Sequence, residues 1–410
     1  MTKRLLVLFL CMLLAFTTAC SSANGNDTPE TTTELKDTTD TNETTEPSDT
    51  TETTEPSDTT EAIKMTEKDF KSAIAYIEQL KKDKKLSYAA FAVGNGEGEF
   101  FHWTLEGTND STLFDMASVT KAAVTTTLFL IAQSEGRIDW NDPLGKYLDA
   151  PADKADIPLW RFLSHTSGLA ASTGLTNSKL ESYKGTPDKI VSAILNRSLA
   201  TKTGTKVTYS DCGFVLLAEV LEKAYGKELD ALYLEKVAIP LGMEHSGYKM
   251  YEKTTDIAKH QDEANRVNDP TAYYLGNVSG NAGLFSNIVD MSLYATELSN
   301  GLPSLQVSPE IFKASLQNRA EGLNDSRAVG WNLVDEDYVQ AGRLFPNGSF
   351  GHTGHTGTSI FVDPETGLWV VLLTNARNHV ANEKVYEMRE NFHNAVADDL
   401  LRYFLSDAEQ

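Results

Sequence analysis

The stretch STLFDMASVTKAAVTTTLFLIAQSEG at residues 111–136 constrains the fold more than any other part of this sequence. Small and apolar residues recur through it at the spacing of a helix face, and Gly136 stands where a glycine commonly follows a helix. Ser118 falls at the start of this predicted helix, where the first backbone N–H groups have no partner within the helix. We therefore expect a buried helix with a serine at its N-terminal end.

Lys121 lies three residues after Ser118, so both side chains project from one face of the predicted helix, about 5–6 Å apart at Cβ. A hydroxyl, an amine close enough to take its proton, and N–H donors that favour negative charge can form an activated nucleophile. Spacing alone does not decide this, because Ser246-Gly-Tyr-Lys249 repeats the S-x-x-K pattern and a helix cap beside a solvated lysine has the same sequence. The position at the head of an apolar helix favours the catalytic interpretation.

Residues 1–20, MTKRLLVLFLCMLLAFTTAC, begin with basic residues, continue as an apolar run and end with small residues before Cys20. This is the pattern of a secretory signal, and the run is too short for a membrane span. Thr17-Thr-Ala-Cys20 is also similar to the lipobox of bacterial lipoproteins, although leucine is usual at the position of Thr17. We expect lipidation at Cys20 and an anchor on the outer face of the bacterial cell membrane, with cleavage and release as the alternative.

Residues 21–62 consist mainly of Thr, Glu, Asp, Ser and Pro, and the segment ETTEPSDTT at 43–51 recurs unchanged at 52–60. With almost no apolar residue, this stretch cannot bury enough surface to offset its ordering entropy, so we expect a disordered linker. It carries about half of the chain's formal net charge of −22. The remaining body is also acidic and lacks a basic cluster, which argues against nucleic-acid binding.

The cysteines and histidines predict neither a disulfide framework nor a metal centre. Cys11 would leave with the signal, Cys20 is the expected lipid site, and Cys212 is then alone in the body. The 8 histidines are scattered, and no Cys or His pair has the spacing of a zinc site. We expect no metal and no cofactor.

The body, residues 63–410, is long enough for one large domain or for two lobes that share a cleft. An amphipathic helix over 66–81 precedes two strands, 86–93 and 99–105, joined by a glycine-rich turn. Helical periods dominate from 143 to about 295, and the strands 359–363 and 368–374 precede a closing helix at about 382–404. The layout predicts an α+β fold, an antiparallel sheet flanked by helices with a mostly helical second lobe and a site between the lobes.

Two further stretches supply candidate site residues. Tyr209-Ser-Asp211 opens an apolar helix, where a tyrosine hydroxyl can point toward a cleft, although an ordinary buried tyrosine is commoner. Gly351-His-Thr-Gly-His-Thr-Gly357 leads into a strand, and its small residues allow close approach of a ligand to the backbone. A tight strand entry is the alternative there, but two consecutive His-Thr-Gly units favour a functional role.

Three of these motifs together resemble a known family. Ser118-Val-Thr-Lys121, Tyr209-Ser-Asp211 and His352-Thr-Gly354 are similar in order and separation to the S-x-x-K, Y-x-N and K-T-G motifs of the serine β-lactamase and penicillin-binding-protein superfamily. The resemblance covers essentially the whole body and implies a β-lactamase/transpeptidase-like fold.

Other stretches narrow the resemblance to the class C-like branch: Leu163-Ser-His-Thr-Ser-Gly-Leu169, Pro240-Leu-Gly-Met243 and Asn281-Ala-Gly-Leu-Phe-Ser286. The segment 267–283, together with the doubled His-Thr-Gly, is similar to a sub-branch that includes amidases acting on muramyl peptides.

The resemblance implies a role for each motif residue. Ser118 would be the acylated nucleophile, Lys121 would assist its deprotonation, and Tyr209 would be the proton shuttle. The oxyanion hole would consist of the backbone N–H groups of Ser118 and of His355, which follows the third motif. The remaining substrate-binding positions would be Asp211, His352, Thr353 and Gly354.

Two positions depart from the family pattern, Asp211 where asparagine is usual and His352 where lysine is usual. A histidine with an unperturbed pKa near 6.5 is mostly neutral at pH 7, whereas lysine is a permanent cation. Asp211 adds a negative charge close to Lys121. Both changes reduce the positive charge of the expected pocket, so efficient β-lactam hydrolysis is disfavoured.

The sequence therefore predicts a monomeric, membrane-anchored serine hydrolase that cleaves an amide or ester through an acyl-enzyme, with peptidoglycan-derived muramyl peptides as favoured substrates. A small-acyl esterase is one alternative, and a β-lactamase or D,D-carboxypeptidase is another if His352 is held protonated. A wall-binding or sensor module without turnover is a third, but intact Ser118, Lys121 and Tyr209 argue against it.

Overall fold

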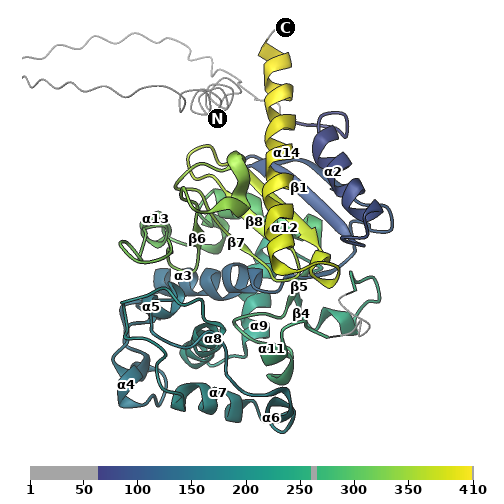
Figure 1. Cartoon of the computed structure of the whole chain (residues 1–410). Coiled ribbons are helices and arrows are strands. Elements are labelled where there is room, and N and C mark those ends of the chain that lie inside the picture. The colour runs from purple at the N-terminus through teal and green to yellow at the C-terminus, as the bar shows by residue number, and fades with distance from the viewer. Residues whose placement is uncertain (1–62, 260–265, 409–410) are drawn as a thin grey trace, which may run out of the picture.

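The computed structural model describes residues 63–259 and 266–408, in which a sheet layer and a helical lobe lie on either side of one central helix (Figure 1). The predicted signal, the linker and Cys20 lie outside the described residues. No helix within the described ranges is long and apolar enough to cross a membrane.

The main sheet has six antiparallel strands in the order β2-β1-β9-β8-β7-β6. They are β1 (Ala89–Asn95), β2 (Gly98–Thr104), β6 (Asn332–Leu333), β7 (Phe350–Thr353), β8 (Ser359–Val362) and β9 (Trp369–Thr374). The beginning and the end of the body meet in the middle of this sheet, where Phe91 pairs with Leu372. The two predicted hairpins are therefore present and lie side by side.

Helices cover both faces of this sheet. The helices α2 (Lys71–Lys82) and α14 (Asn382–Ala408) pack on one face, and α12 (Ile288–Ser299) packs on the other. Because side chains alternate along a strand, Phe91 and Val93 join the cluster of α2 and α14, whereas Ala90 and Ala92 join the core beneath α12. A strand buried on both faces reads as one continuous apolar run, as β1 and β9 do.

The middle of the chain forms a helical lobe around α8 (Asp211–Tyr225). Its other helices are short: η2 (Leu144–Lys146), α4 (Ala152–Ala155), α5 (Leu159–Leu163), α6 (Asn177–Glu181), α7 (Pro187–Asn196), α9 (Leu229–Tyr233), η3 (Leu234–Ala238), α10 (Ile239–Leu241), η4 (Met250–Glu252) and α11 (Pro270–Tyr274). Further along the chain, η5 (Pro303–Leu305) and α13 (Pro309–Ser315) precede β6, η6 (Val339–Leu344) lies between β6 and β7, and η7 (Ala376–Asn378) lies between β9 and α14.

A second sheet, which the sequence did not predict, joins three short strands in the order β3-β5-β4. They are β3 (Phe114–Asp115), β4 (Gly247–Tyr248) and β5 (Leu284–Ser286). Strands of this length show no sequence periodicity, so only their pairing across distant segments reveals them.

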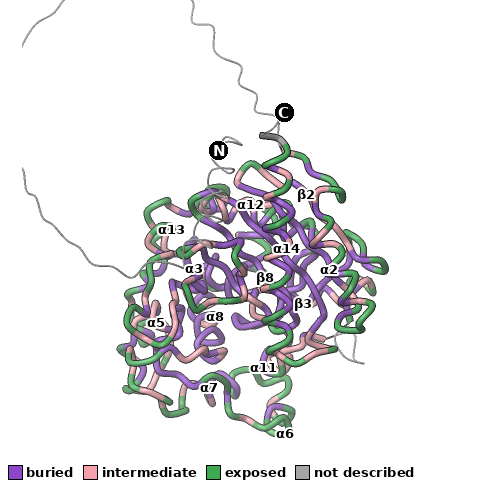
Figure 2. The backbone as a smooth tube through the Cα atoms, turned by 45° about the horizontal axis from the view of Figure 1, so that its top comes forward, coloured by how far each residue is buried: buried purple, intermediate pink, exposed green. Residues whose placement is uncertain are grey.

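The central helix has Ser118 at its N-terminal end, as the sequence predicted, and occupies only the later part of the stretch 111–136. Residues 114–115 belong to β3, and the helix begins just after Ser118 with the π-helical segment η1 (Lys121–Thr126), which continues into α3 (Thr127–Ser134). All side chains from Val119 to Ala132 are buried, and Figure 2 shows this segment inside the molecule. The predicted α+β fold, with its antiparallel sheet and flanking helices, is confirmed.

Candidate active site

Ser118 lies next to a tight turn that a buried carboxylate holds in place. Asp115 Oδ1 accepts a hydrogen bond from the N–H of Ala117 at 2.8 Å, and its Oδ2 accepts one from the N–H of Asn268 at 2.7 Å. Burial raises the pKa of Asp115 to about 6. Ala117 has a φ of +47°, a left-handed conformation that residues other than glycine rarely adopt. Strain of this kind is typical of functional sites, and here it places Ser118 at the start of the helix.

Lys121 reaches Ser118 from inside the protein. Its side chain is 0% exposed, and its Nζ lies 3.0 Å from Ser118 Oγ, 2.8 Å from the carbonyl oxygen of Asn281 and 2.7 Å from Asp211 Oδ1. A lysine ammonium has three N–H donors and no acceptor. The three short contacts therefore match the donors of a protonated lysine.

The carboxylate of Asp211 keeps Lys121 protonated. Burial by itself lowers the pKa of Lys121, but Asp211 and Tyr209 outweigh it and raise the pKa above its usual value. The sequence led us to expect an amine that takes the proton of Ser118. The structure instead places an ammonium that donates to Ser118 Oγ, because an acid from a distant segment lies within ion-pair distance.

The start of α8 positions Tyr209 and Asp211. Ser210 caps this helix, and its Oγ accepts a hydrogen bond from the N–H of Gly213 at 3.2 Å. The ring of Tyr209 rests on that of His165 with centroids 4.5 Å apart, and His165 Nδ1 accepts a hydrogen bond from the N–H of Ser210 at 3.0 Å. Burial lowers the pKa of His165 well below its usual value. His165 therefore acts as a neutral support for Tyr209, a role that the sequence did not indicate.

Two threonine hydroxyls that follow His352 attach the turn at 354–357 to the backbone that precedes Ser118. Thr356 Oγ1 donates to the carbonyl oxygen of Asp115 at 2.8 Å, and Thr358 Oγ1 donates to that of Met116 at 3.2 Å. Gly354 leaves no room for a side chain, since a Cβ there would lie 2.1 Å from Thr358 Oγ1 and 2.6 Å from the carbonyl oxygen of Met116. The backbone after the third motif is thus fixed against the backbone that precedes Ser118.

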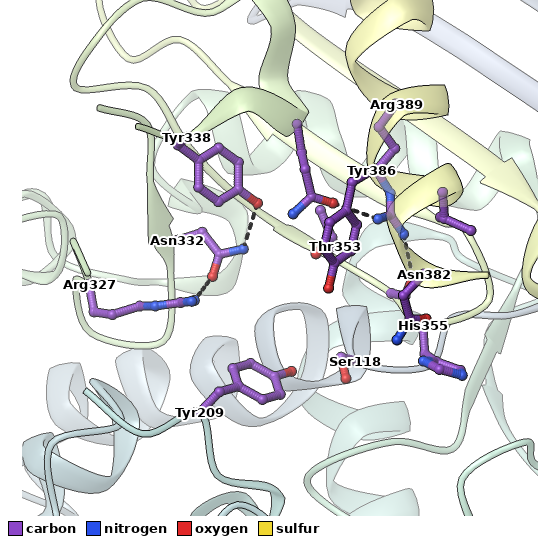
Figure 3. Close-up of a pocket in the computed structure, with 13 residues that line it drawn as sticks. Ser118, Tyr209, Arg327, Asn332, Tyr338, Thr353, His355, Asn382, Tyr386 and Arg389 are labelled. Atoms are coloured by element: carbon purple, nitrogen blue, oxygen red, sulfur yellow. Dashed lines mark hydrogen bonds between the residues drawn. The ribbon is translucent and has the colours of Figure 1, made fainter. Parts of the chain in front are cut away.

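This arrangement brings the two predicted oxyanion donors into one cavity. The backbone N–H groups of Ser118 and His355 have no acceptor within the described part of the chain. Both residues line a cavity of about 330 Å³, and Figure 3 shows Ser118 between Tyr209 and His355. Thr353 and Gly354 line the same cavity. Fixed N–H donors of this kind can stabilise the negative oxygen of a tetrahedral intermediate.

His352 faces inward from β7 and is 2% exposed. Its Nδ1 lies 2.9 Å from the carbonyl oxygen of Thr353. Burial, followed by the positive charge of Lys121, lowers the pKa of His352 to about 3. The alternative in which a protonated His352 binds a carboxylate is therefore wrong at neutral pH, because a buried ring beside an ammonium remains neutral.

The cavity also contains residues that no sequence motif marks. Arg327 donates to Asp325 Oδ2 from Nε at 2.9 Å and from Nη2 at 2.7 Å, and its guanidinium lies 5.7 Å from the centre of the Tyr209 ring. Arg389 enters the cavity lining from α14. Figure 3 shows Arg327 and Arg389 on opposite sides of the cavity.

The second S-x-x-K pattern forms no comparable site. Ser246 is buried and donates to Asp290 Oδ2 at 2.8 Å, and Lys249 has a left-handed backbone, so the two do not share a helix face. Cys212 is a free, buried thiol. In the two described ranges, no group of three His, Cys, Asp or Glu side chains could hold a metal ion.

Comparison with known proteins agrees with this geometry. The family model described as Beta-lactamase matches residues 73–391. The chain is 30% identical over 302 residues to the N-acetylmuramyl-L-alanine amidase of Bacillus subtilis (strain 168). This match covers 65% of this chain and 68% of the amidase.

Two solved structures share the fold. A class C β-lactamase matches with a TM-score of 0.64 at 18% identity, over 80% of this chain and 96% of that protein. A penicillin-binding protein homologue from Caulobacter crescentus matches with a TM-score of 0.64 at 16% identity, over 82% and 99%. The chain therefore belongs to the β-lactamase family and is a serine hydrolase.

Proposed function

We propose that the protein cleaves amide or ester bonds through an acyl-enzyme on Ser118, and that its substrates are muramyl peptides derived from peptidoglycan. The observation that carries the proposal is the position of Ser118 Oγ, which accepts a hydrogen bond from buried Lys121 at 3.0 Å in a cavity that it shares with His355. Similarity to an N-acetylmuramyl-L-alanine amidase supports the substrate class.

In the proposed reaction Ser118 Oγ attacks the carbonyl carbon of the substrate. The Tyr209 hydroxyl receives the proton of Ser118 and passes its own proton to the leaving amine or alcohol, so that the scissile bond breaks as the new ester forms. The Lys121 ammonium stabilises negative charge on these oxygens and keeps its own protons. A water molecule then attacks the ester, and the same proton route restores Ser118 and releases the acid.

The N–H groups of Ser118 and His355 would stabilise the carbonyl oxygen as it becomes negative, each by about 3–4 kcal/mol. The hydrogen bonds of Thr356 and Thr358 to the backbone before Ser118 support this role, since they fix the donors before substrate binds. Donors that are already oriented need no reorganisation during the reaction.

We also propose that the signal at 1–20 exports the chain, that Cys20 is lipidated, and that the linker at 21–62 holds the enzyme off the membrane. Cys20→Ala should then leave the membrane fraction, either secreted or unprocessed. Unaltered protein free in the medium, with an N-terminus beyond residue 20, would contradict the anchor.

A substrate panel tests the proposed function. We expect kcat/KM for N-acetylmuramyl-L-alanine to exceed the values for a D-Ala-D-Ala peptide, a penicillin and p-nitrophenyl butyrate. Ser118→Ala should lose turnover of every substrate by several orders of magnitude, since the members of a catalytic unit act together. Ser246→Ala, which alters the second S-x-x-K, is the matched control and should retain turnover while folded. Faster cleavage of the D-Ala-D-Ala peptide or the penicillin would contradict the substrate class.

A further inference from the structure

Arg389 is a buried cation in the lining of the Ser118 cavity. Its side chain is 2% exposed, and it lies on α14 on the side of the cavity where Asn382 and Tyr386 also point inward (Figure 3). Burial lowers the pKa of Arg389 to about 10, so the guanidinium still carries its charge at neutral pH.

Every hydrogen-bond acceptor of Arg389 in the described chain is uncharged. Nη1 donates to Gln340 Oε1 at 2.7 Å, and Nη2 donates to the carbonyl oxygens of Thr358, at 3.1 Å, and Gly354. The Nε atom is buried and has no partner among the described residues. A guanidinium has five N–H donors, so part of its capacity stays unused.

No carboxylate in residues 63–259 or 266–408 lies within 4.0 Å of the Arg389 guanidinium. After burial, which lowers the pKa of Arg389, the groups that act on this pKa are the phenols of Tyr338 and Tyr386, and both raise it. A buried charge without a counter-ion is strongly unfavourable, and proteins rarely keep one unless a ligand or a partner balances it.

Arg327 in the same cavity shows the contrast. Asp325 accepts two hydrogen bonds from its guanidinium, so that charge is balanced within the protein. No Asp or Glu is among the described residues that line the cavity. Arg389 is thus the cation of this lining for which the described chain supplies no anion.

We propose that Arg389 is a specificity-determining residue that pairs with a carboxylate of the substrate. Gln340 also lines the cavity, and its amide oxygen occupies a place on Nη1 that a carboxylate could take. The substrate class is then an amide or ester with a free carboxylate near the scissile bond. This inference deepens the proposed function and rests on acyl transfer at Ser118, while the cation comes from α14 and not from the third motif, where His352 is neutral.

The rival explanation is that Arg389 only holds the turn of Gly354 and Thr358. Gln340→Glu separates the two roles, because it supplies an internal carboxylate to Nη1 and leaves the hydrogen bonds of Nη2 in place. If Arg389 pairs with the substrate, this variant should lose activity selectively on carboxylate substrates. Gln317→Glu, which adds the same charge at an exposed position outside the cavity lining, is the matched control.

The experiment measures kcat/KM on two substrate pairs that differ by one negative charge. The first pair is N-acetylmuramyl-L-alanine and its carboxamide, and the second is the p-nitrophenyl ester of glutaric acid and the same ester capped as a methyl ester. We expect the parent to prefer the charged member, and Gln340→Glu to lower that preference by about tenfold or more in at least one pair. Arg389→Lys should keep part of the preference, and Arg389→Gln should lose it.

Equal losses on charged and neutral members, or no preference in the parent, would overturn the role of Arg389. The parent measurement stands even if a variant fails to fold. The proposed function fails separately: cleavage of the ester pair alone, with the expected charge effect, would keep Arg389 and exclude the muramyl substrate. Cleavage of both muramyl substrates without a charge effect would do the reverse.

Discussion

Two walls of the cavity each carry a buried cation, and the protein balances only one of them. The Ser118 wall, which is Ser118 together with Lys121 and Asp211 behind the cavity lining, holds its lysine in an ion pair of 2.7 Å. The α14 wall, formed by Arg389 with Gly354, holds a guanidinium whose described partners are all neutral. The two cations are buried to a similar degree, so burial does not explain the difference.

The two walls differ in role: the Ser118 wall serves catalysis, and the α14 wall serves substrate recognition. On the Ser118 wall the charge is matched inside the protein, which fixes the ammonium against the nucleophile and needs nothing from the substrate. On the α14 wall the charge remains unmatched, and a substrate carboxylate is the natural counter-ion. Variants that remove or unpair the lysine, or that disturb the contact between the two walls, test whether the two cations differ in function.

The largest effect should follow from removing the cation of the Ser118 wall. Lys121→Met should lower kcat by about a thousandfold or more, because single members of a catalytic unit account for most of its rate. Lys154→Met is the matched control, since Lys154 is also buried beside an acid, Asp153, but its Nζ donates to that carboxylate and not to Ser118. Turnover of a nitrophenyl ester at saturation measures the effect, and a kcat for Lys121→Met within tenfold of the parent would contradict the account.

The next largest effect on kcat should follow from a side chain added at Gly354, where the α14 wall packs against the backbone that precedes Ser118. Gly354→Ala forces a Cβ to 2.6 Å from the carbonyl oxygen of Met116, which displaces the donor at His355. We expect kcat to fall by about a hundredfold, the usual result of losing one oxyanion donor. Gly213→Ala is the control, because its Cβ would lie 3.6 Å from the nearest atom. An unchanged kcat in Gly354→Ala would show that the turn does not position the donor.

Asp211→Asn should make the Ser118 wall resemble the α14 wall by leaving its cation without an acid at ion-pair distance. Asp211 raises the pKa of Lys121, so the pair stabilises the fold at neutral pH and is lost only as pH rises beyond the usual lysine range. We expect the free energy of unfolding at pH 7 to fall by about 1–2 kcal/mol. Asp153→Asn removes the ion-pair partner of Lys154, which is more exposed than Asp211. This variant should lower the free energy of unfolding by less than about 1 kcal/mol. Urea denaturation measures both free energies of unfolding. Equal decreases in the two variants would mean that the ion pair of Lys121 and Asp211 stabilises the fold no more than the pair of Lys154 and Asp153.

The smallest effect concerns pH. Because the pKa of His352 is about 3 in the folded state, the histidine binds a proton only in the unfolded chain just below pH 6.5. Stability from His352 should therefore fall as pH drops, by about 1 kcal/mol between pH 6.5 and 5.5, and His352→Gln should remove this slope.

His102 is the control, because its effect on the pH dependence of stability has the opposite sign: the Glu99 carboxylate raises the pKa of His102. Its contribution is present at low pH and is lost as pH rises, so His102→Gln should steepen the acid loss that His352→Gln removes. Denaturation curves at the two pH values measure both slopes. A slope that His352→Gln leaves unchanged would contradict the lowered pKa, since it would mean that the ring binds protons equally in the folded and unfolded states.

The sequence predicted well those elements whose defining residues are close along the chain. The hairpins appear as β1–β2 and β8–β9, and the closing helix appears as α14. The motif residues Ser118, Lys121, Asp211 and Tyr209 do meet at one site, together with the turn that follows His352. Their order and residue types carry that information.

What the sequence could not predict depends on groups that meet across long separations. The carbonyl oxygen that binds Lys121 belongs to Asn281, 160 residues further along the chain. The protonation of Lys121 and the neutrality of His352 follow from such contacts and from burial. Arg389 has no motif, and its significance comes from the missing carboxylate in its described surroundings.

The most direct test of the account is to locate the acyl group during turnover. The protein is mixed with p-nitrophenyl butyrate, quenched in acid during the first turnovers and digested for mass spectrometry. The account predicts a butyryl adduct on the peptide that contains Ser118, and none in Ser118→Ala. An adduct on another residue with Ser118 unmodified, for instance on Ser246, would contradict it.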